Sequence, residues 1–253
     1  MMPSRRTLLR MLAGTAVFAA SSVRAFAKTS VIARLIDQTN QGDLSQRIEF
    51  ISYGLLGARY QADTLIGGPR KQEVFVMRDD AFDCVTFCET VLAAAMAKNL
   101  SEFETILHRI RYEHGEVRWD ERNHYFAEWS RRIVEKHMCR PVAMEPSVSI
   151  EKTVDGVLGP RKVAITGIAP STLIAGRDLL HNGDVIGFVS KQSSLDFFHV
   201  GFITFGKKGS LLLRHASQNH GRVLDEDLKE FLADNGVKYV TLLRAQDTAM
   251  ASN

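Results

Sequence analysis

One cysteine and two histidines stand out as residues that together could carry out nucleophilic chemistry. Cys84 follows Asp83, a residue type that favours helix N-caps, and opens a strongly helical run. A thiol at a helix start faces unpaired backbone N–H groups and the positive end of the helix dipole, so its thiolate is favoured. His199 and His215 follow far downstream on two runs that read as strands. This combination predicts a cysteine hydrolase.

Amide hydrolysis by a thiol needs three things: a thiolate, an imidazolium that protonates the leaving amine, and donors for the oxyanion. The backbone N–H of Cys84 at the helix start would be one such donor. His199 is the candidate base. If His215 accepts a hydrogen bond from His199, it fixes the tautomer and the orientation of that ring.

Two other interpretations of these residues stay open. Cys84 could be an inert buried thiol, as most cysteines are. Cys84, His199 and His215 could instead bind zinc, and His220 could join them or be solvated. The sequence has no compact metal-ligand spacing, and we predict neither a metal nor a cofactor.

The other two cysteines are predicted to have packing roles. Cys84 and Cys88 lie one helical turn apart and point the same way, which is a poor geometry for a disulfide. Cys88 is therefore expected to be a small buried apolar residue. Cys139 is assigned to packing at the end of a helix.

The first residues predict an export signal. Arg5 and Arg6 precede an apolar stretch over 11–20 that is too short to span a membrane, and Ala25-Phe26-Ala27 is a small-x-small cleavage site. The paired arginines favour the twin-arginine type. We expect cleavage after Ala27 and a periplasmic protein without stable membrane insertion; an uncleaved anchor is the alternative.

The export signal also changes the charge argument. The chain has 32 basic and 29 acidic side chains, and four arginines but no acid lie within residues 1–27. The mature chain would then have 28 basic and 29 acidic side chains, a net charge of −1. The sequence gives no reason to expect nucleic-acid binding.

Residues 28–253 are long enough for one large domain, with a helical insert around 100–140. Periodicity predicts helices over 31–40, 44–55, 84–98, 100–110, 128–137 and 225–235. It predicts strands over 72–77, 163–167, 184–190, 199–205, 210–215 and 237–244. Ser101 and Glu104 form a capping-box pattern, and Pro141 would stop the fifth helix. Residues 206–209 read as a turn that joins the two histidine strands in a hairpin. Helices followed by an antiparallel sheet predict an α+β domain.

The chain resembles the NlpC-type peptidoglycan cysteine hydrolase superfamily, within it the N-acetylmuramoyl-L-alanine amidase-like branch. The resemblance rests on four segments in the family's order, which together cover most of the mature chain: Gly57-Ala58-Arg59-Tyr60, Asp83-Cys84-Val85-Thr86-Phe87, Gly183 to Val189 leading to His199-Val200-Gly201-Phe202, and His215-Ala216-Ser217. It implies a papain-like fold with the catalytic cysteine at a helix N-terminus. It also implies Cys84 as nucleophile, His199 as base, His215 as the group that orients it, and Tyr60 as the tyrosine of the site.

A segment rich in arginine, amide and aromatic side chains is a candidate substrate groove. Arg122, Asn123 and His124 are the predicted contact residues, since guanidinium groups bind carboxylates and rings pack on sugars. The alternative is a solvated helix–loop–helix with Tyr125 and Trp129 in the core.

These observations predict a periplasmic amidase that hydrolyses the N-acetylmuramoyl-L-alanine bond of peptidoglycan or its fragments. Cleavage of the D-γ-glutamyl-diaminopimelate bond, which other members of the superfamily perform, is the alternative within the enzyme class. A module that binds peptidoglycan fragments without turnover is the alternative outside it.

Overall fold

The computed structural model of the chain describes residues 30–39, 42–157 and 159–247. The predicted export signal at 1–27 lies outside the described residues. No described helix is long and apolar enough to cross a membrane.

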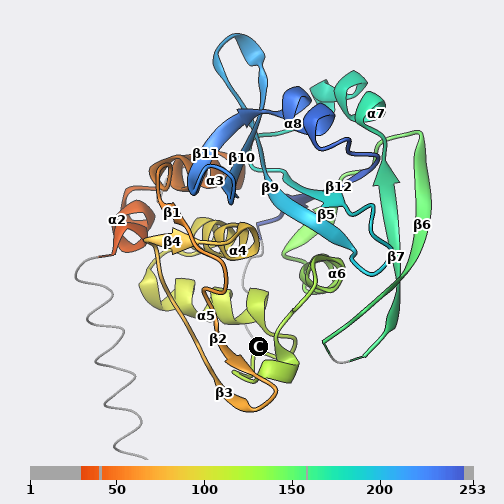
Figure 1. Cartoon of the computed structure of the whole chain (residues 1–253). Coiled ribbons are helices and arrows are strands. Elements are labelled where there is room, and N and C mark those ends of the chain that lie inside the picture. The colour runs from red at the N-terminus through yellow and green to blue at the C-terminus, as the bar shows by residue number, and fades with distance from the viewer. Residues whose placement is uncertain (1–29, 40–41, 158, 248–253) are drawn as a thin grey trace, which may run out of the picture.

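Helices and short strands make up the first half of the chain (Figure 1). The helices of this half are α2 (Val31–Gln38), α3 (Leu44–Gly54), α4 (Cys84–Met96), α5 (Leu100–Arg111), the 3₁₀ turn η1 (Trp119–Glu121) and α6 (Phe126–Glu135). Four short strands lie between α3 and α4: β1 (Arg59–Tyr60), β2 (Ile66–Gly68), β3 (Lys71–Val74) and β4 (Ala81–Phe82).

The second half of the chain supplies most of the sheet. Its strands are β5 (Cys139–Pro141), β6 (Ser147–Val154), β7 (Arg161–Ile168), β8 (Val185–Val189), β9 (Phe197–Phe205), β10 (Leu211–Ser217), β11 (Arg222–Asp227) and β12 (Val240–Ala245). Short helical segments connect them: α7 (Pro170–Ala175), η2 (Arg177–Leu179), η3 (Lys207–Gly209) and α8 (Leu228–Asp234).

These elements form a mixed α+β structure around one large, curled sheet. The strand order is β4-β1-β11-β10-β9-β8-β12-β7-β6, and β5 pairs with β12. All of these pairings are antiparallel except that of β1 with β4. The predicted hairpin of β9 and β10 is confirmed, with Leu211 opposite Phe205.

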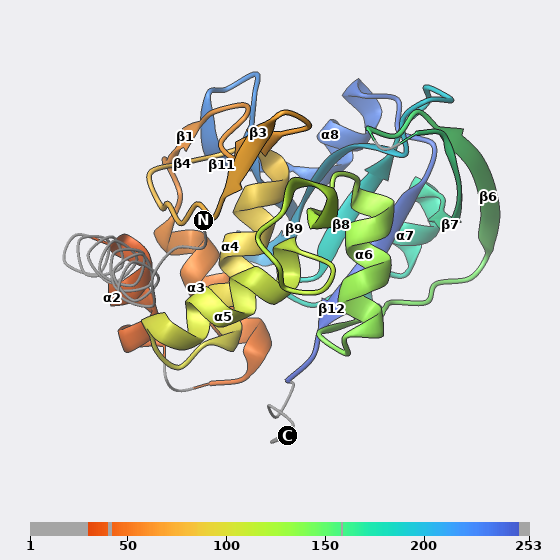
Figure 2. The same cartoon turned by 90° about the horizontal axis from the view of Figure 1, so that it is seen from below.

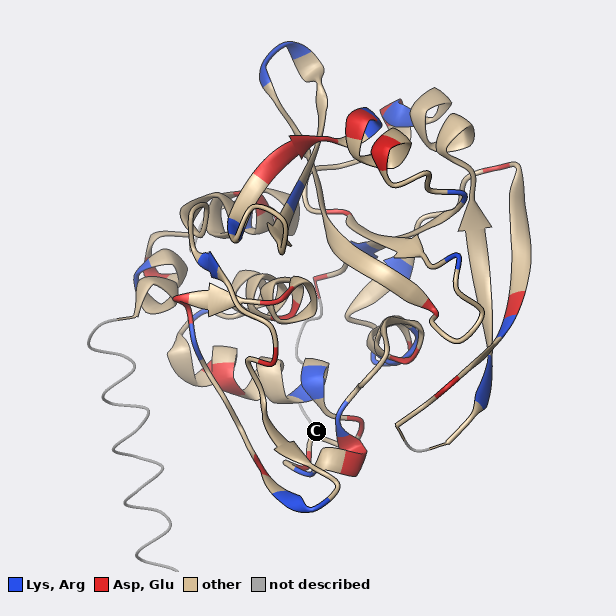
Figure 3. Ribbon diagram, in the orientation of Figure 1, with Lys and Arg blue, Asp and Glu red and all other residues tan. Residues whose placement is uncertain are grey.

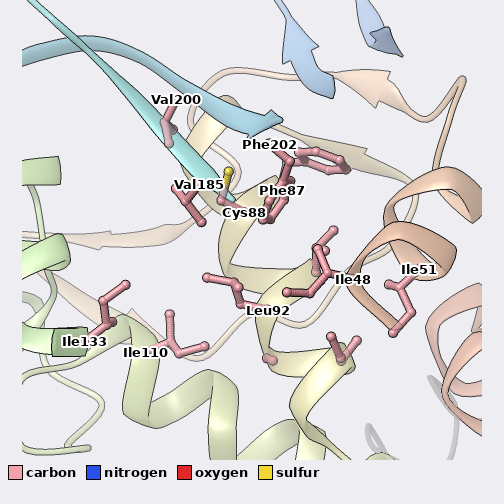
Figure 4. Packing of buried hydrophobic residues seen from close by; sticks show 14 of the residues in the cluster. Ile48, Ile51, Phe87, Cys88, Leu92, Ile110, Ile133, Val185, Val200 and Phe202 are labelled. Atoms are coloured by element: carbon pink, nitrogen blue, oxygen red, sulfur yellow. The ribbon is translucent and has the colours of Figure 1, made fainter. Parts of the chain in front are cut away.

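The central helix α4 is apolar on nearly all sides because other elements surround it. Ten of its thirteen residues are buried, which is the pattern of a helix inside a core. Helix α5 lies beside it in Figure 2. Figure 4 shows Phe87 and Cys88 of α4 pointing toward Val200 and Phe202 of β9. The buried state expected of Cys88 is confirmed by its exposed fraction of 1%.

The opposite face of the sheet holds a second apolar cluster. Leu213 of β10, Ile203 of β9 and Phe188 of β8 are buried there, together with Leu228 and Leu232 of α8. The sheet is therefore covered on both faces around β8 to β10, which explains why all five residues of β8 are buried.

Three local predictions are wrong. Helix α5 begins one residue before Ser101, because the side chain of Asn99 accepts a 2.9 Å hydrogen bond from the Glu102 backbone N–H. Asparagine is as good an N-cap as serine, so the pattern marked the wrong residue. Helix α6 ends at Glu135, before Pro141 is reached. Cys139 does not pack at a helix end but lies in β5, opposite Ala245 of β12.

The late helix was also predicted too long. It begins at Leu228, and 222–227 form β11, which pairs with β10 over six residues. Three consecutive acidic residues, Asp225, Glu226 and Asp227, make the end of this strand resemble a helix start in the sequence. They lie on the strand that Figure 3 colours red.

Candidate active site

The predicted cap of α4 is confirmed and places Cys84 at the first helical position. Asp83 Oδ1 accepts hydrogen bonds from the backbone N–H groups of Val85 (3.0 Å) and Thr86 (2.8 Å). In return, the Asp83 backbone N–H donates to Thr86 Oγ1 at 3.0 Å. This reciprocal pair sets where the helix begins. The partly exposed Cys84 therefore lies directly at the start of α4.

The thiol of Cys84 lies against the strand that carries His199. The pairing of β9 with β10 runs from Phe205 opposite Leu211 to Phe202 opposite Arg214. Just upstream of that last pair, the backbone N–H of Val200 is within hydrogen-bond reach of the Cys84 thiol. The start of α4 thus approaches β9 at Val200, the residue that follows His199.

His199 and His215 contact each other directly. His199 Nε2 lies 2.6 Å from His215 Nδ1, and the two rings are nearly perpendicular at 88°. Phe231 of α8 packs against both rings, with centroid distances of 5.6 Å and 5.5 Å. The hairpin brings the two predicted histidines together, and an aromatic ring restricts their movement.

Glu226 is a member of this group that the sequence analysis missed. His215 Nε2 contacts Glu226 Oε2 on the neighbouring strand β11. His215 lies opposite Leu224, which makes Glu226 its diagonal neighbour on the same face of the sheet. Because the sequence predicted a helix over 225–235, it did not indicate that Glu226 lies beside His215. A strand assigned to 222–227 would have put Glu226 and Leu224 on one face.

Burial keeps the thiol of Cys84 protonated. The thiolate that the helix start was expected to favour is therefore not the resting form. Burial, followed by the negative charge of Asp83, raises the pKa of Cys84 to about 12. The N–H groups of Val200, Cys84 and Val85 act in the opposite direction but are outweighed. Desolvation of an anion is the stronger effect where the thiol has little water around it.

Burial also keeps the imidazoles neutral. It lowers the pKa of His199 to about 3, with the charge of His215 as the second cause. The pKa of His215 is lowered by burial as well, against an opposing effect of Glu226. The group therefore rests as a thiol and two neutral imidazoles.

Tyr60, which the resemblance implies as the tyrosine of the site, lies near enough to Cys84 for the two groups to interact electrostatically. Burial raises the pKa of Tyr60, and the charges of Cys84, Asp83 and Asp63 raise it further. Its backbone N–H donates to Gly221 O at 2.8 Å, which ties β1 to the turn between β10 and β11. The phenol therefore belongs to the surroundings of the thiol.

The structure holds Arg122, Asn123 and His124 through contacts within the protein. Arg122 Nη1 lies 3.0 Å from Glu73 Oε1, and His124 Nε2 lies 2.7 Å from Trp119 O. Asn123 is buried, and both ends of its amide have partners: Nδ2 donates to Ile110 O, and Oδ1 accepts from Arg132 Nη1. A direct substrate contact does not fit the burial of Asn123.

The nearby aromatic residues separate into two environments. Trp129 is in the core with 1% of its surface exposed. The Tyr125 hydroxyl donates to Asp155 O at 2.8 Å, and the Arg161 guanidinium lies 4.2 Å from the centre of its ring.

The spacing of the histidine nitrogens differs from that of two zinc ligands. Ligands at the usual Zn–N distance in a tetrahedral site are separated by roughly 3.3 Å, whereas His199 Nε2 and His215 Nδ1 are 2.6 Å apart. Among the described residues, the cluster with metal-ligand spacing is Glu113, His114 and Glu121, which includes neither Cys84 nor the two histidines of the hairpin. The histidine contact is a hydrogen bond.

Comparison with known proteins points to one family. A family model described as N-acetylmuramoyl-L-alanine amidase-like matches residues 50–157 and 151–237. No curated protein matches the chain. Among solved structures, a Legionella pneumophila protein of the DUF1460 family has a TM-score of 0.78 and 20% identity, covering 89% of this chain and 96% of its own. An N-acetylmuramoyl-L-alanine amidase from Bacteroides uniformis has a TM-score of 0.71 and 24% identity, covering 81% of this chain and all of its own. At these identities the two structures share the fold with this chain.

Proposed function

The chain belongs to the N-acetylmuramoyl-L-alanine amidase-like family, and on that premise we propose that it is a cysteine-dependent amidase of peptidoglycan or its fragments. The bond cleaved is the amide between the lactyl carbonyl of N-acetylmuramic acid and the nitrogen of L-alanine. The observation that carries this proposal is the placement of Cys84 at the start of α4, where its thiol meets the backbone of Val200 on β9. Val200 directly follows His199, which is hydrogen-bonded to His215.

The reaction begins with a neutral thiol and a neutral imidazole. Because burial disfavours both charged forms, the proton leaves sulfur only as the sulfur attacks the lactyl carbonyl. His199 takes that proton, and the carbonyl oxygen becomes an oxyanion. The backbone N–H of Cys84 is the donor available at the helix start to stabilise it.

Collapse of the tetrahedral intermediate breaks the C–N bond. His199 returns its proton to the departing nitrogen of L-alanine, and the lactyl group stays on sulfur as a thioester. Water then attacks the thioester while His199 accepts its proton, and the thiol leaves with that proton. The muramic acid carboxylate and the peptide are the two products, and no oxidant or cofactor is consumed.

Tyr60 is our candidate for substrate contact beside the thiol, since its phenol can donate to a carbonyl of the peptide. Arg122 and His124 stay predictions for the more distant part of the groove. In this scheme Asn123 supports the loop by holding Arg132 and Ile110.

Two other functions make different predictions for the same sample. A D-γ-glutamyl-diaminopimelate endopeptidase would release L-Ala-D-Glu still attached to the sugar. A binding module would leave muropeptides intact. The hydrogen-bonded His199 and His215 favour turnover, because a binding site has no need of a proton acceptor beside a thiol.

Mass spectrometry of defined muropeptides separates these functions. The amidase proposal expects free peptide and peptide-free muramic acid, with activity falling at least about 10³-fold in Cys84→Ala. Cys139→Ala is the matched control, because it removes a buried thiol on β5, a strand that pairs with β12 and not with β9, and this variant should keep its activity. Intact muropeptides, or products cut after D-glutamate, would overturn the proposed bond.

We place this activity in the periplasm on the basis of the export signal predicted for residues 1–27. Intact mass of the exported protein tests the placement, and a mature chain beginning at Lys28 is expected. A mature species that retains residues 11–20 would contradict it.

A further inference from the structure

We propose that Glu226 is a positioning residue that sets the direction of the hydrogen bonds in the histidine pair, so that the free nitrogen of His199 is a proton acceptor. This inference rests on the proposed function, in which His199 takes the thiol proton. It adds a fourth residue to the three that the sequence suggested, and it comes from one contact on β11.

The direction of each hydrogen bond follows from the chemistry of its partner. A carboxylate can only accept, so the contact with Glu226 requires a hydrogen on His215 Nε2. A neutral imidazole carries one N–H, which leaves His215 Nδ1 as an acceptor. The 2.6 Å contact then requires a hydrogen on His199 Nε2. His199 Nδ1 is left with a lone pair.

That lone pair is what a base needs. With the opposite arrangement, His215 Nδ1 would donate to His199 Nε2, and the hydrogen of neutral His199 would sit on Nδ1. The ring nitrogen that remains for the thiol would then be unable to accept a proton. The Glu226 carboxylate, acting through His215, therefore decides whether His199 can act as a base.

The position of Glu226 is set by the register of β10 and β11. Its neighbour Asp225 points to the opposite face of the sheet, where its carboxylate binds the guanidinium of Arg214 at 2.7 Å and 2.8 Å. Arg214 also contacts Glu49 of α3 at 2.9 Å. Alternation along the strand then directs Glu226 toward His215.

A second histidine lies near the same carboxylate without taking over its role. His220 Nδ1 is 3.9 Å from Glu226 Oε1, and about half of its side chain is exposed. The Ser217 hydroxyl lies closer to it, at 3.1 Å. Glu226 Oε2 contacts His215, and Oε1 is the atom that faces His220.

The direct test is the position of the ring hydrogens in wild-type protein. Long-range ¹H–¹⁵N spectra of histidine-labelled protein distinguish the two neutral tautomers, and His199→Gln and His215→Asn assign the signals. We expect both rings to carry their hydrogen on Nε2. A hydrogen on His199 Nδ1 would overturn the inference, whether or not the protein hydrolyses muropeptides.

The second test is a double-mutant cycle. Glu226→Gln should lower kcat by about 10- to 100-fold with little change in KM. The reason is that a glutamine amide can donate to His215 Nε2, which reverses the direction of both hydrogen bonds that His215 makes. In the His215→Asn background the same substitution should change kcat by less than about twofold, because the asparagine oxygen accepts from His199 without help. The exposed Glu230→Gln, on α8 close by, is the matched control.

The outcomes of the cycle separate the possible roles. An equal loss of activity from Glu226→Gln in both backgrounds would show a structural role independent of His215 and would overturn the inference. Unchanged activity in the wild-type background would do the same. If wild-type protein hydrolyses no muropeptide, the proposed function fails, and the tautomer spectra still decide the role of Glu226.

Discussion

The thiol of Cys84 lies within hydrogen-bond reach of the backbone N–H of Val200, the residue that follows His199 in β9. More than a hundred residues separate the two in the chain, and the contact exists because α4 meets β9 just where β9 parts from β10. It brings sulfur to the strand of the base, and it also buries the sulfur. The raised pKa and the proposed attack therefore have the same structural origin.

The first prediction concerns the pH dependence of thiol alkylation. Because the pKa of Cys84 is raised to about 12, its thiolate fraction should grow about tenfold per pH unit from pH 6 to 9. Peptide mapping after brief iodoacetamide treatment should show this rise at Cys84, ahead of Cys88 and Cys139, which are 1% exposed. A labelling rate that levels off below pH 8 would indicate a stable thiolate–imidazolium pair instead.

The second prediction separates the two histidines. His199→Ala should lower kcat by at least about 10³-fold, since it removes the proton carrier. His215→Asn should keep a measurable remnant, about 10- to 100-fold below wild type, because an amide oxygen can still accept from His199. Equal and complete loss in both variants would give His215 a direct role in the reaction.

The same assay tests the zinc interpretation. Activity should survive EDTA and be abolished by a thiol reagent. Loss on chelation, restored by added zinc, would contradict a simple cysteine mechanism.

The third prediction is a loss of stability in acid that His199 causes. Its pKa is about 3 in the folded protein and near 6.5 in the unfolded chain, so between these values the unfolded chain binds more protons. The free energy of unfolding should therefore fall as the pH drops below 6.5, by up to about 1.4 kcal/mol per pH unit from this group. At higher pH the ring is neutral in both states and the penalty disappears.

Urea titrations at several pH values measure this contribution. His199→Gln should lose less stability than wild type between pH 6.5 and pH 4, and the exposed His181→Gln is the control. Parallel pH curves for wild type and His199→Gln would show that His199 does not resist protonation in the folded state.

The fourth prediction concerns the ion pair of Arg122 with Glu73. The side chain of Glu73 is 2% exposed, and it also accepts a 3.0 Å hydrogen bond from the Tyr112 hydroxyl. Arg122→Ala should lower the free energy of unfolding by about 3 kcal/mol, because it leaves a buried carboxylate without its cation. Adding Glu73→Gln should restore part of the stability.

Kinetics then decide whether Arg122 also contacts substrate. If its role is limited to Glu73, the Arg122→Ala/Glu73→Gln variant should have a wild-type KM. A KM that stays raised in the stabilised double variant would support the substrate contact that the sequence suggested.

Local sequence determined the elements that carry the site. Asp83 before an apolar helical run specified the start of α4 and put Cys84 at its first turn, since capping and periodicity involve neighbours only. The alternation around His199 and His215, with glycines between them, specified the hairpin in the same way. Where two local signals competed, as Asn99 and Ser101 did before α5, the sequence did not decide between them.

Tertiary structure decided everything that depends on distance through space. The register of β11 against β10 brought Glu226 to His215, and no local pattern in an acidic stretch revealed that strand. Packing against β9 removed water from the thiol of the partly exposed Cys84 and reversed the expected direction of its pKa, because desolvation depends on the atoms that surround a group and not on its neighbours in the chain. Tertiary contacts also bury Asn123, which the sequence placed among the substrate contacts, and they give both ends of its amide a partner within the protein.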